Sequence, residues 1–296
     1  MAMPKLLKMS AGVILFLASY AGLAHSQSQP QISPSDMVKS VIYNELHPSQ
    51  VSDIHWQYRV DKETDGKQET REVVETKSGS LDKLLATSGK PLTAAQTRDE
   101  SARILRFSHS PQEQQKAEQA RRKDAEQCDA LMKMIPDAFL FDYAGESGNL
   151  ARVVFKPNPH FRPPSREGRV LQQMAGEIWV DARQKRLVSI NGQLINEVKF
   201  AGGLLGHLEK GGQFTVKRAE LAPGDWEVAE MNVNMRGKAL FFKTISVQQK
   251  ELHSNFERVA DDISLSDAAN LLLRQNLVAS KQPILSGTGS TSQGDR

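Results

Sequence analysis

Hydrophobic and polar positions alternate most regularly in the stretch from Gly176 to Phe256. Short runs rich in Val, Ile, Phe, Trp and Thr are separated there by breaks that contain glycine. Alternation with a period of two is typical of strands, and evenly spaced turn signals join strands into an antiparallel meander. The pattern therefore predicts five or six strands with tight turns and one buried face.

The alternation slips by one residue in two neighbouring runs of this stretch. Apolar residues occupy even positions up to Val228 and odd positions from Met231, and the segment Phe214–Leu221 slips in the same way. A one-residue slip moves side chains to the opposite face, and a β-bulge accommodates it. Because bulges bend a sheet, we expect a strongly curved antiparallel sheet, an incomplete barrel whose concave apolar face is covered by helices or by a ligand.

The chain before the meander predicts a short helix and two further hairpins. Residues Asp36–Glu45 carry apolar positions at helical spacing, with Ser33 or Ser35 as the N-cap. Val51–Val60 alternates, and Asp65-Gly66 is a turn signal before the returning strand Lys67–Lys77. The segments 137–143 and 149–156 form the second expected hairpin.

A charged region between these hairpins predicts a pair of helices, Thr93–Phe107 and Pro111–Met134. Ser110 is the expected cap of the second helix, because proline is favoured at the first helical position. Only the apolar end of this helix is expected to pack on the body, so the pair is either an arm that projects from the sheet or a lid over it. Just before it, Leu81, Leu84 and Leu85 suggest one or two helical turns.

The proline-rich segment Pro157–Pro164 is incompatible with a helix or an interior strand, because proline lacks a backbone donor and fixes φ. We expect an ordered loop in which exposed Phe161 and Arg162 either grip a partner or serve only loop packing. The glycine-rich segment Val198–Gly212 lacks the residues of a phosphate-binding loop. We expect a tight crossing there, with Leu204, Leu205 and Leu208 against the sheet.

The domain organisation follows from these segments. We expect a single curved-sheet domain with one helical insertion, followed by a short helix that docks on the body or on a partner and by a polar, disordered tail. The expected boundaries are a signal peptide 1–26, the domain 27–263 with its arm 93–135, the C-terminal helix 264–279 and the tail 280–296.

The first 26 residues have the layout of an export signal, with Lys5 and Lys8 before the apolar run Ala11–Leu23. At about a dozen residues this run is shorter than the roughly twenty that cross a bilayer. A cleaved, periplasmic or secreted protein without a transmembrane span is therefore expected, with an uncleaved anchor as the alternative. The only cysteine, Cys128, lies far from the cleavage point, so neither a lipidated cysteine nor an internal disulfide is expected.

Charge and motifs restrict the function. Thirty-eight basic residues, less the two lysines of the leader, face 35 acidic ones, a net charge of about +1 that argues against nucleic-acid binding. No metal or cofactor is expected, and no catalytic motif is present. An enzyme stays open only if scattered acid and base residues converge in space, of which the candidates are Glu146, Asp181, His207 and Asp225.

The block from Ile178 to Val259, with its hairpins and its IWVDARQKRLVSINGQL and GDWEVAEMNVNMRGKALFFKT runs, resembles a group of uncharacterised exported bacterial proteins. Their sheets are similar to the periplasmic lipoprotein-carrier fold of LolA and LolB. That resemblance implies a curved antiparallel sheet with helices on its concave side, where members of the family hold acyl chains. The chain departs from the carriers by the helical arm and the proline-rich loop, and no carrier residue aligns to a position here.

Two hypotheses for function follow. The first is a non-enzymatic binding protein that holds a lipid or lipoprotein acyl chain in the concave apolar face. The second is a structural or interaction protein of the cell envelope that holds a protein partner through the helical arm. For the first, the expected lining residues, which could equally be core, are Trp56, Tyr58, Phe139, Phe141, Ile178, Val180, Phe214, Trp226 and Phe242.

Overall fold

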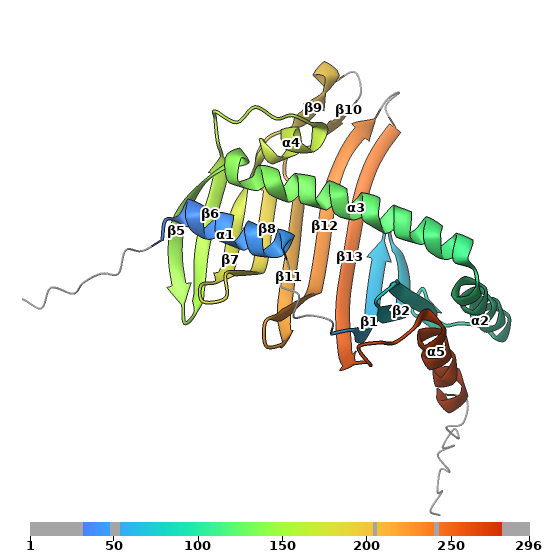
Figure 1. The fold of residues 1–296 in the computed structure, drawn as a ribbon. Coiled ribbons are helices and arrows are strands. Elements are labelled where there is room, and N and C mark those ends of the chain that lie inside the picture. Colours follow the sequence, from blue (N-terminus) through green and yellow to red (C-terminus); the bar gives the residue numbers. More distant parts are fainter. Residues whose placement is uncertain (1–31, 48–53, 204–205, 240–242, 280–296) are drawn as a thin grey trace, which may run out of the picture. The chain divides into compact units, whose positions relative to one another are not determined.

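The computed structural model describes residues 32–47, 54–203, 206–239 and 243–279. The chain divides into two compact units, Met1–Ile32 and Ser33–Arg296, and the architecture below is that of the second unit. The expected signal peptide, the tail 280–296 and Phe242, Leu204 and Leu205 lie outside the described residues. The fold class is α+β, with five α-helices and a 13-stranded antiparallel sheet among the described residues (Figure 1).

The elements follow one another along the chain with short connections. The helices are α1 Pro34–Leu46, α2 Ala94–His109, α3 Pro111–Ala138, α4 Arg166–Leu171 and α5 Leu265–Ala279, with a 3-10 turn at Ala201–Gly203. The strands are β1 Trp56–Thr64, β2 Lys67–Thr76, β3 Gly79–Thr87, β4 Lys90–Pro91, β5 Phe139–Ser147, β6 Leu150–Pro157, β7 Met174–Asp181, β8 Arg186–Leu194, β9 Val198–Phe200, β10 Gly206–Leu208, β11 Gln213–Ala222, β12 Asp225–Ala239 and β13 Lys243–Arg258.

The main path of the sheet runs β4-β3-β2-β1-β13-β12-β11-β8-β7-β6-β5, and all its described pairings are antiparallel. The N-terminal hairpin is thus added beside the C-terminal strand β13, so strands from both ends of the unit meet in the middle of the sheet. The short strands β9 and β10 lie off this path, where β10 pairs with β12.

The expectation of a strongly curved, incomplete barrel is wrong, because the sheet is neither closed nor strongly curled (Figure 1). The path ends at β4, which has two residues, and at β5. The expected bulge itself is confirmed: pairing of β11 with β12 shifts register between Lys217 and Arg218. Further shifts are spread over four other strand pairs. Bulges therefore bend individual strand pairs without bringing the two edges together.

Helix α1 forms where the sequence predicts it. Ser33 is its N-cap and accepts a hydrogen bond from the backbone N–H of Asp36 at 3.1 Å, while Pro34 occupies the first turn. The apolar stripe of the helix, Met37, Val38 and Val41, is buried. The principal contacts of α1 are with β5, β8 and α3. This helix therefore covers one end of one sheet face.

The expected helical pair is α2 and α3. Thr93 and Gln96 form a capping box at the start of α2, and the side chain of Ser110 caps α3 with Pro111 in its first turn. Helix α3 runs past the expected end to Ala138, with Pro136 inside it. Its residues 118–128 are all exposed, whereas its last turns contact α1, α4 and β5. The middle of α3 is therefore solvated, and within it Arg121 donates a 2.7 Å hydrogen bond from Nη2 to the backbone carbonyl of Ser78, between β2 and β3.

A second core lies at the other end of the sheet, where α2 and α5 pack on β2 and β3. The buried Lys83 on β3 donates a 2.6 Å hydrogen bond from Nζ to the backbone carbonyl of Leu272 on α5. This bond satisfies a charge that would otherwise be costly to bury. The buried apolar side chains of this core are Val74, Leu81, Ile104, Ala268, Ala269 and Leu272.

Two local predictions were wrong. The helical turn expected around Leu81–Leu85 is strand β3, and its pairing with β2 shifts register between Leu84 and Ala86. Leu85 is the extra residue of that bulge. It interrupts the alternation of the strand, so that the apolar positions 81, 84 and 85 resemble helical spacing. Phe161 is buried rather than exposed, while Arg162 is exposed as expected. Helix α4, which follows the proline-rich loop, was not predicted.

Candidate functional site on the apolar face of the sheet

The register assigns the side chains of the sheet to two chemically different faces, because residues directly opposite in a ladder share a face. One face is apolar across six strands, and we call it the apolar face. Its first row is Phe141, Phe155, Gly176, Gly192, Phe214 and Val233, and its second row is Tyr143, Val153, Ile178, Ile190, Val216 and Met231. The residues between these on each strand are mostly polar and lie on the opposite face.

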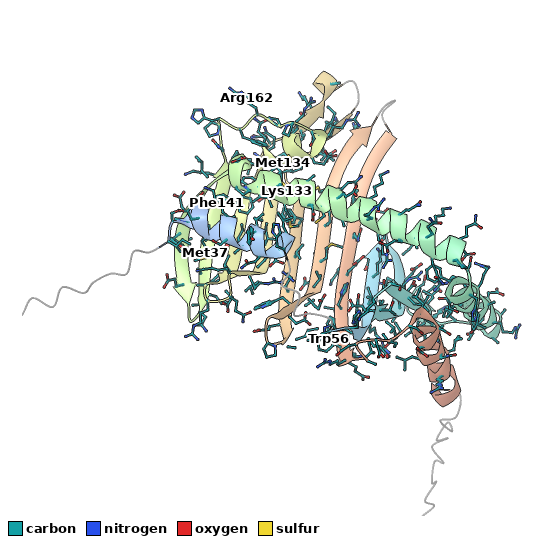
Figure 2. The ribbon with its side chains drawn as sticks, viewed as in Figure 1. Met37, Trp56, Lys133, Met134, Phe141 and Arg162 are labelled. Atoms are coloured by element: carbon teal, nitrogen blue, oxygen red, sulfur yellow. The ribbon has the colours of Figure 1, made fainter. Side chains whose placement is uncertain are left out.

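Four of the expected lining residues, Phe139, Phe141, Ile178 and Val180, are buried at the end of the apolar face that α1 contacts. The rings of Phe139 and Phe141 meet edge to face with centroids 6.2 Å apart. Figure 2 shows Met37 of α1 in the same part of the molecule as Phe141. The structure therefore places these four residues in the core beneath α1.

The apolar face continues past the helix that covers it. The principal helix contacts with the sheet are those of α1 with β5 and β8, of α3 with β5, of α4 with β9, of α2 with β3, and of α5 with β2 and β3. Strands β11 and β12 lie between these regions. We call their half-buried apolar side chains the uncovered section, which consists of Phe214, Val216, Met231, Val233 and Met235. Of the expected lining residues, Phe214 lies in this section.

The ring of Phe214 packs over Gly192, which has no side chain to displace it. The two residues pair across β8 and β11, and a β-carbon on Gly192 would overlap the Phe214 ring. Gly176 continues this row on β7, where a β-carbon would meet the Phe155 ring and the Asn191 carbonyl. The two glycines thus leave room for the rings of Phe214 and Phe155 on the apolar face.

Trp56, Tyr58 and Trp226 lie at another part of the sheet, and Figure 2 shows Trp56 well apart from Met37 and Phe141. The indole N–H of Trp56 donates to the Asp225 carboxylate at 2.7 Å, and that of Trp226 donates to Gln184 at 2.9 Å. Tyr58 stacks on His253 and Phe256, with ring centroids 5.3 and 5.0 Å away. These three expected lining residues thus form a polar and aromatic cluster separate from the one beneath α1.

A group of three charged residues, Glu45, Arg186 and Arg218, connects the C-terminal end of α1 to the sheet, and we call this group the latch. The Glu45 carboxylate forms ion pairs with Arg186 of β8, 3.4 Å away, and with Arg218 of β11. Asn44 donates from Nδ2 to the carbonyls of Gln184 and Lys185, at 3.3 and 3.1 Å. All three charged side chains of the latch are less than one-fifth exposed. The latch therefore marks the boundary between the covered and uncovered sections.

Carboxyl groups gather beside the aromatic cluster. Burial, followed by repulsion from Glu75 and Asp225, raises the pKa of Glu227 to about 7. Burial also raises the pKa of Glu75, although its carboxylate accepts a 3.1 Å hydrogen bond from the Trp56 backbone N–H. The pKa of Tyr58 is raised by burial and by Glu75. This group of residues can hold an extra proton near neutral pH.

Sequence reasoning missed the latch and the carboxyl cluster. Glu45 and Arg218 are 173 residues apart, and no local pattern distinguishes either from a surface charge. Glu75 of β2 and Glu227 of β12 likewise come together only through the strand order β2-β1-β13-β12. A period-two count over β2 would place Glu75 on the same face as Val73, which is the one signal that it is half-buried.

The scattered acid and base residues have separate structural contacts. Asp181 accepts hydrogen bonds from the backbone N–H groups of Arg183 and Gln184, and so stabilises the turn between β7 and β8. Asp225 accepts from Trp56, and His207 lies 3.6 Å from Glu197. Among the residues that the structure describes, no group of three or more His, Cys, Asp and Glu side chains has the geometry to hold a metal ion.

Comparisons with known proteins give only distant similarities. No protein-family model and no curated protein matches the chain. A DUF1329 family protein from Desulfovibrio piger has 10% identity and a TM-score of 0.26, covering 77% of this chain and 96% of its own. MucB, solved in complex with MucA(peri), has 9% identity and a TM-score of 0.21, covering 80% and 97%. At these TM-scores neither similarity carries an argument about function.

No helix within the described ranges is long and apolar enough to span a membrane.

Proposed function

We propose that this chain is an exported, non-enzymatic binding protein that holds a lipid or lipoprotein acyl chain against the uncovered section of its apolar face. The observation that carries the proposal is the length of this face: it extends from β5 to β12, whereas the principal strand contacts of the covering helix α1 are with β5 and β8. Helix α3 crosses in front of β12 and β13 in Figure 1, but its principal strand contact is with β5. Half-exposed apolar side chains on adjacent strands are an open surface that an apolar ligand can cover.

The arrangement of α3 supports an extended ligand. Residues 118–128 of this helix are exposed and rich in charged side chains, one of which, Arg121, reaches the Ser78 carbonyl between β2 and β3. It offers no apolar stripe with which to cover the section itself. Each methylene removed from water contributes about 0.8 kcal/mol, so an acyl chain of a dozen carbons gains on the order of 10 kcal/mol before its ordering cost. An acyl chain therefore has enough apolar surface to bind here.

Native mass spectrometry with solvent extraction tests this proposal on protein purified from a periplasm without detergent. Val216→Gln places an amide in the uncovered section, and Lys217→Gln is the matched control, because its side chain lies on the opposite face of the same strand. We expect a lipid adduct on the wild type and on Lys217→Gln that is lost in Val216→Gln. A wild-type protein that stays without adduct after incubation with phospholipid and with acylated peptide contradicts the proposal.

The second candidate is an interaction protein of the cell envelope that holds a partner through α2 and α3. It is favoured by the exposure of residues 118–128, which carry charges on all sides of the helix. In that case charge reversal in this segment abolishes capture of the partner, whereas Val216→Gln leaves capture unchanged. Val216→Gln and a protein with reversed charges in residues 118–128 therefore separate the two functions.

A further inference from the structure

The face opposite the apolar one carries an unusual group of uncharged polar side chains. In the register, Gln213 pairs with both Gln193 and Asn234, and Thr215 pairs with both Asn191 and Asn232. Two complete rows on β8, β11 and β12 thus consist of amides and one hydroxyl. We call this set the amide field, which consists of Asn191, Gln193, Gln213, Thr215, Asn232 and Asn234.

Strand formation does not account for the amide field. Asparagine is depleted in strands, and a solvated face is ordinarily supplied with Lys and Glu, which are abundant in this chain. Four of the six side chains, Gln193, Gln213, Asn232 and Asn234, are exposed. Apart from a 3.4 Å contact of Asn191 with Glu177, no side-chain hydrogen bond of the field is found among the described residues. Its donors and acceptors are therefore available to a ligand.

One side of the field is hollowed. A depression of about 490 Å³ is lined by four residues of the field, Asn191, Gln193, Gln213 and Thr215, and by the smaller residues Val154 and Ala175. This volume falls in the range of sites for small molecules. Gly176 and Gly192, whose β-carbons would point to the apolar face, also line it, so backbone atoms form part of its floor.

The rim of this depression has no free charge to offer. Arg152 holds Glu177 through two nitrogens, Nε at 2.8 Å and Nη2 at 2.6 Å from Oε2. This hydrogen bond, together with smaller contributions from Trp179 and Asn191, lowers the pKa of Glu177, so the carboxylate stays ionised and paired. Trp179, partly exposed, lies opposite Arg152 in the ladder. The site thus combines neutral amides, a neutralised ion pair and one aromatic ring.

We propose that the amide field and its depression bind a neutral saccharide chain. Each primary amide carries donors and an acceptor side by side, which suits the adjacent hydroxyls of a sugar. The two charged residues that line the depression, Arg152 and Glu177, neutralise each other, and Lys250 of β13 lies opposite Asn232 at the edge of the field. The partly exposed ring of Trp179 supplies an apolar surface for the face of a pyranose. From β7 to β12 the site crosses four strands, about 14 Å at the usual strand spacing, which is enough for a short oligosaccharide.

The test is a titration of the isotope-labelled whole chain with chitohexaose, cellohexaose and maltohexaose, followed by NMR of the side-chain amide groups. We expect at least one of the three to shift the Gln193, Gln213 and Asn232 amide signals. Gln213→Ala with Asn232→Ala should weaken that binding about tenfold, because two hydrogen bonds are lost. Lys217→Gln, on the same face but outside the field, should leave it unchanged.

Two results would overturn the proposal: no shift with any of the three oligosaccharides, or binding that persists undiminished in the double variant. The outcome is independent of the acyl-chain proposal, because the two sites lie on opposite faces of the sheet. Val216→Gln should leave saccharide binding intact, and the Gln213→Ala, Asn232→Ala protein should retain its lipid adduct.

Discussion

The ring of Phe214 on β11 occupies the space that a side chain on Gly192 of β8 would fill. We predict that Gly192→Ala forces this ring away from the sheet and lowers the free energy of unfolding by about 2 kcal/mol, the usual cost of overpacking. Urea unfolding measures the change. Because the clash is with one ring, Phe214→Ala combined with Gly192→Ala should destabilise by less than the sum of the two single changes. Strict additivity would contradict the contact.

The Glu45 latch should matter far more than an exposed ion pair. Glu45→Gln leaves Arg186 and Arg218 without their carboxylate in a largely buried setting, so we predict a loss of about 3 kcal/mol in the free energy of unfolding. The control is Arg122→Gln, which removes an exposed pair with Glu126 on α3 and should change stability by less than about 0.5 kcal/mol. Equal effects of the two substitutions would show that the latch does not hold α1.

Stability should fall as the pH rises through neutrality because of Glu227. Its pKa in the folded protein, about 7, lies above the ordinary 4.5, so the folded state binds more protons than the unfolded state between these values. The free energy of unfolding therefore decreases from about pH 5 to pH 8, on the order of 2 kcal/mol after allowance for its partial exposure. Burial raises the pKa of Glu75 in the same direction.

Urea midpoints measured at pH 5 and pH 8 check this prediction. In Glu227→Gln most of the decrease should disappear, because the side chain no longer titrates. A variant with the same decrease as the wild type would assign the pH dependence to other groups.

The hydrogen bond between Lys83 and the Leu272 carbonyl should anchor α5. Lys83→Met keeps the length of the side chain but removes the donor, so β3 loses its hydrogen bond to α5. We predict about 1 to 3 kcal/mol of destabilisation and faster amide hydrogen exchange in α5 than in α1. Uniformly faster exchange in both helices would indicate a global rather than a local effect.

Local chemistry in the sequence predicts much of the fold. The caps Ser33 and Ser110, the Asp65-Gly66 turn and the period of two in β11 and β12 each depend on neighbouring residues, and the structure confirms them. The register slip was likewise visible, because a bulge reverses the alternation at one point in the chain. The sequence did not reveal that the sheet stays open, because closure depends on whether the two edge strands meet.

The candidate site was less predictable than the fold. Apolar identity alone did not separate buried Phe139 and Ile178 from half-exposed Phe214, because α1 covers one part of the face and leaves the other open. The position of α1 on the sheet involves long-range contacts such as the ion pair of Glu45 with Arg218, which leave no periodic signal in the sequence. The amide field is also invisible until the register brings its strands together.

The most direct test of the account locates a bound acyl chain on the sheet. The whole chain, deuterated except for its Val and Met methyl groups, is mixed with a protonated phospholipid, and intermolecular NOEs are recorded. We predict NOEs from the acyl methylenes to Val216, Met231 and Val233 in the uncovered section and none to buried Val74 in the second core. Binding without NOEs to those three methyl groups, or no binding at all, would contradict the claim that the open apolar face is the functional surface.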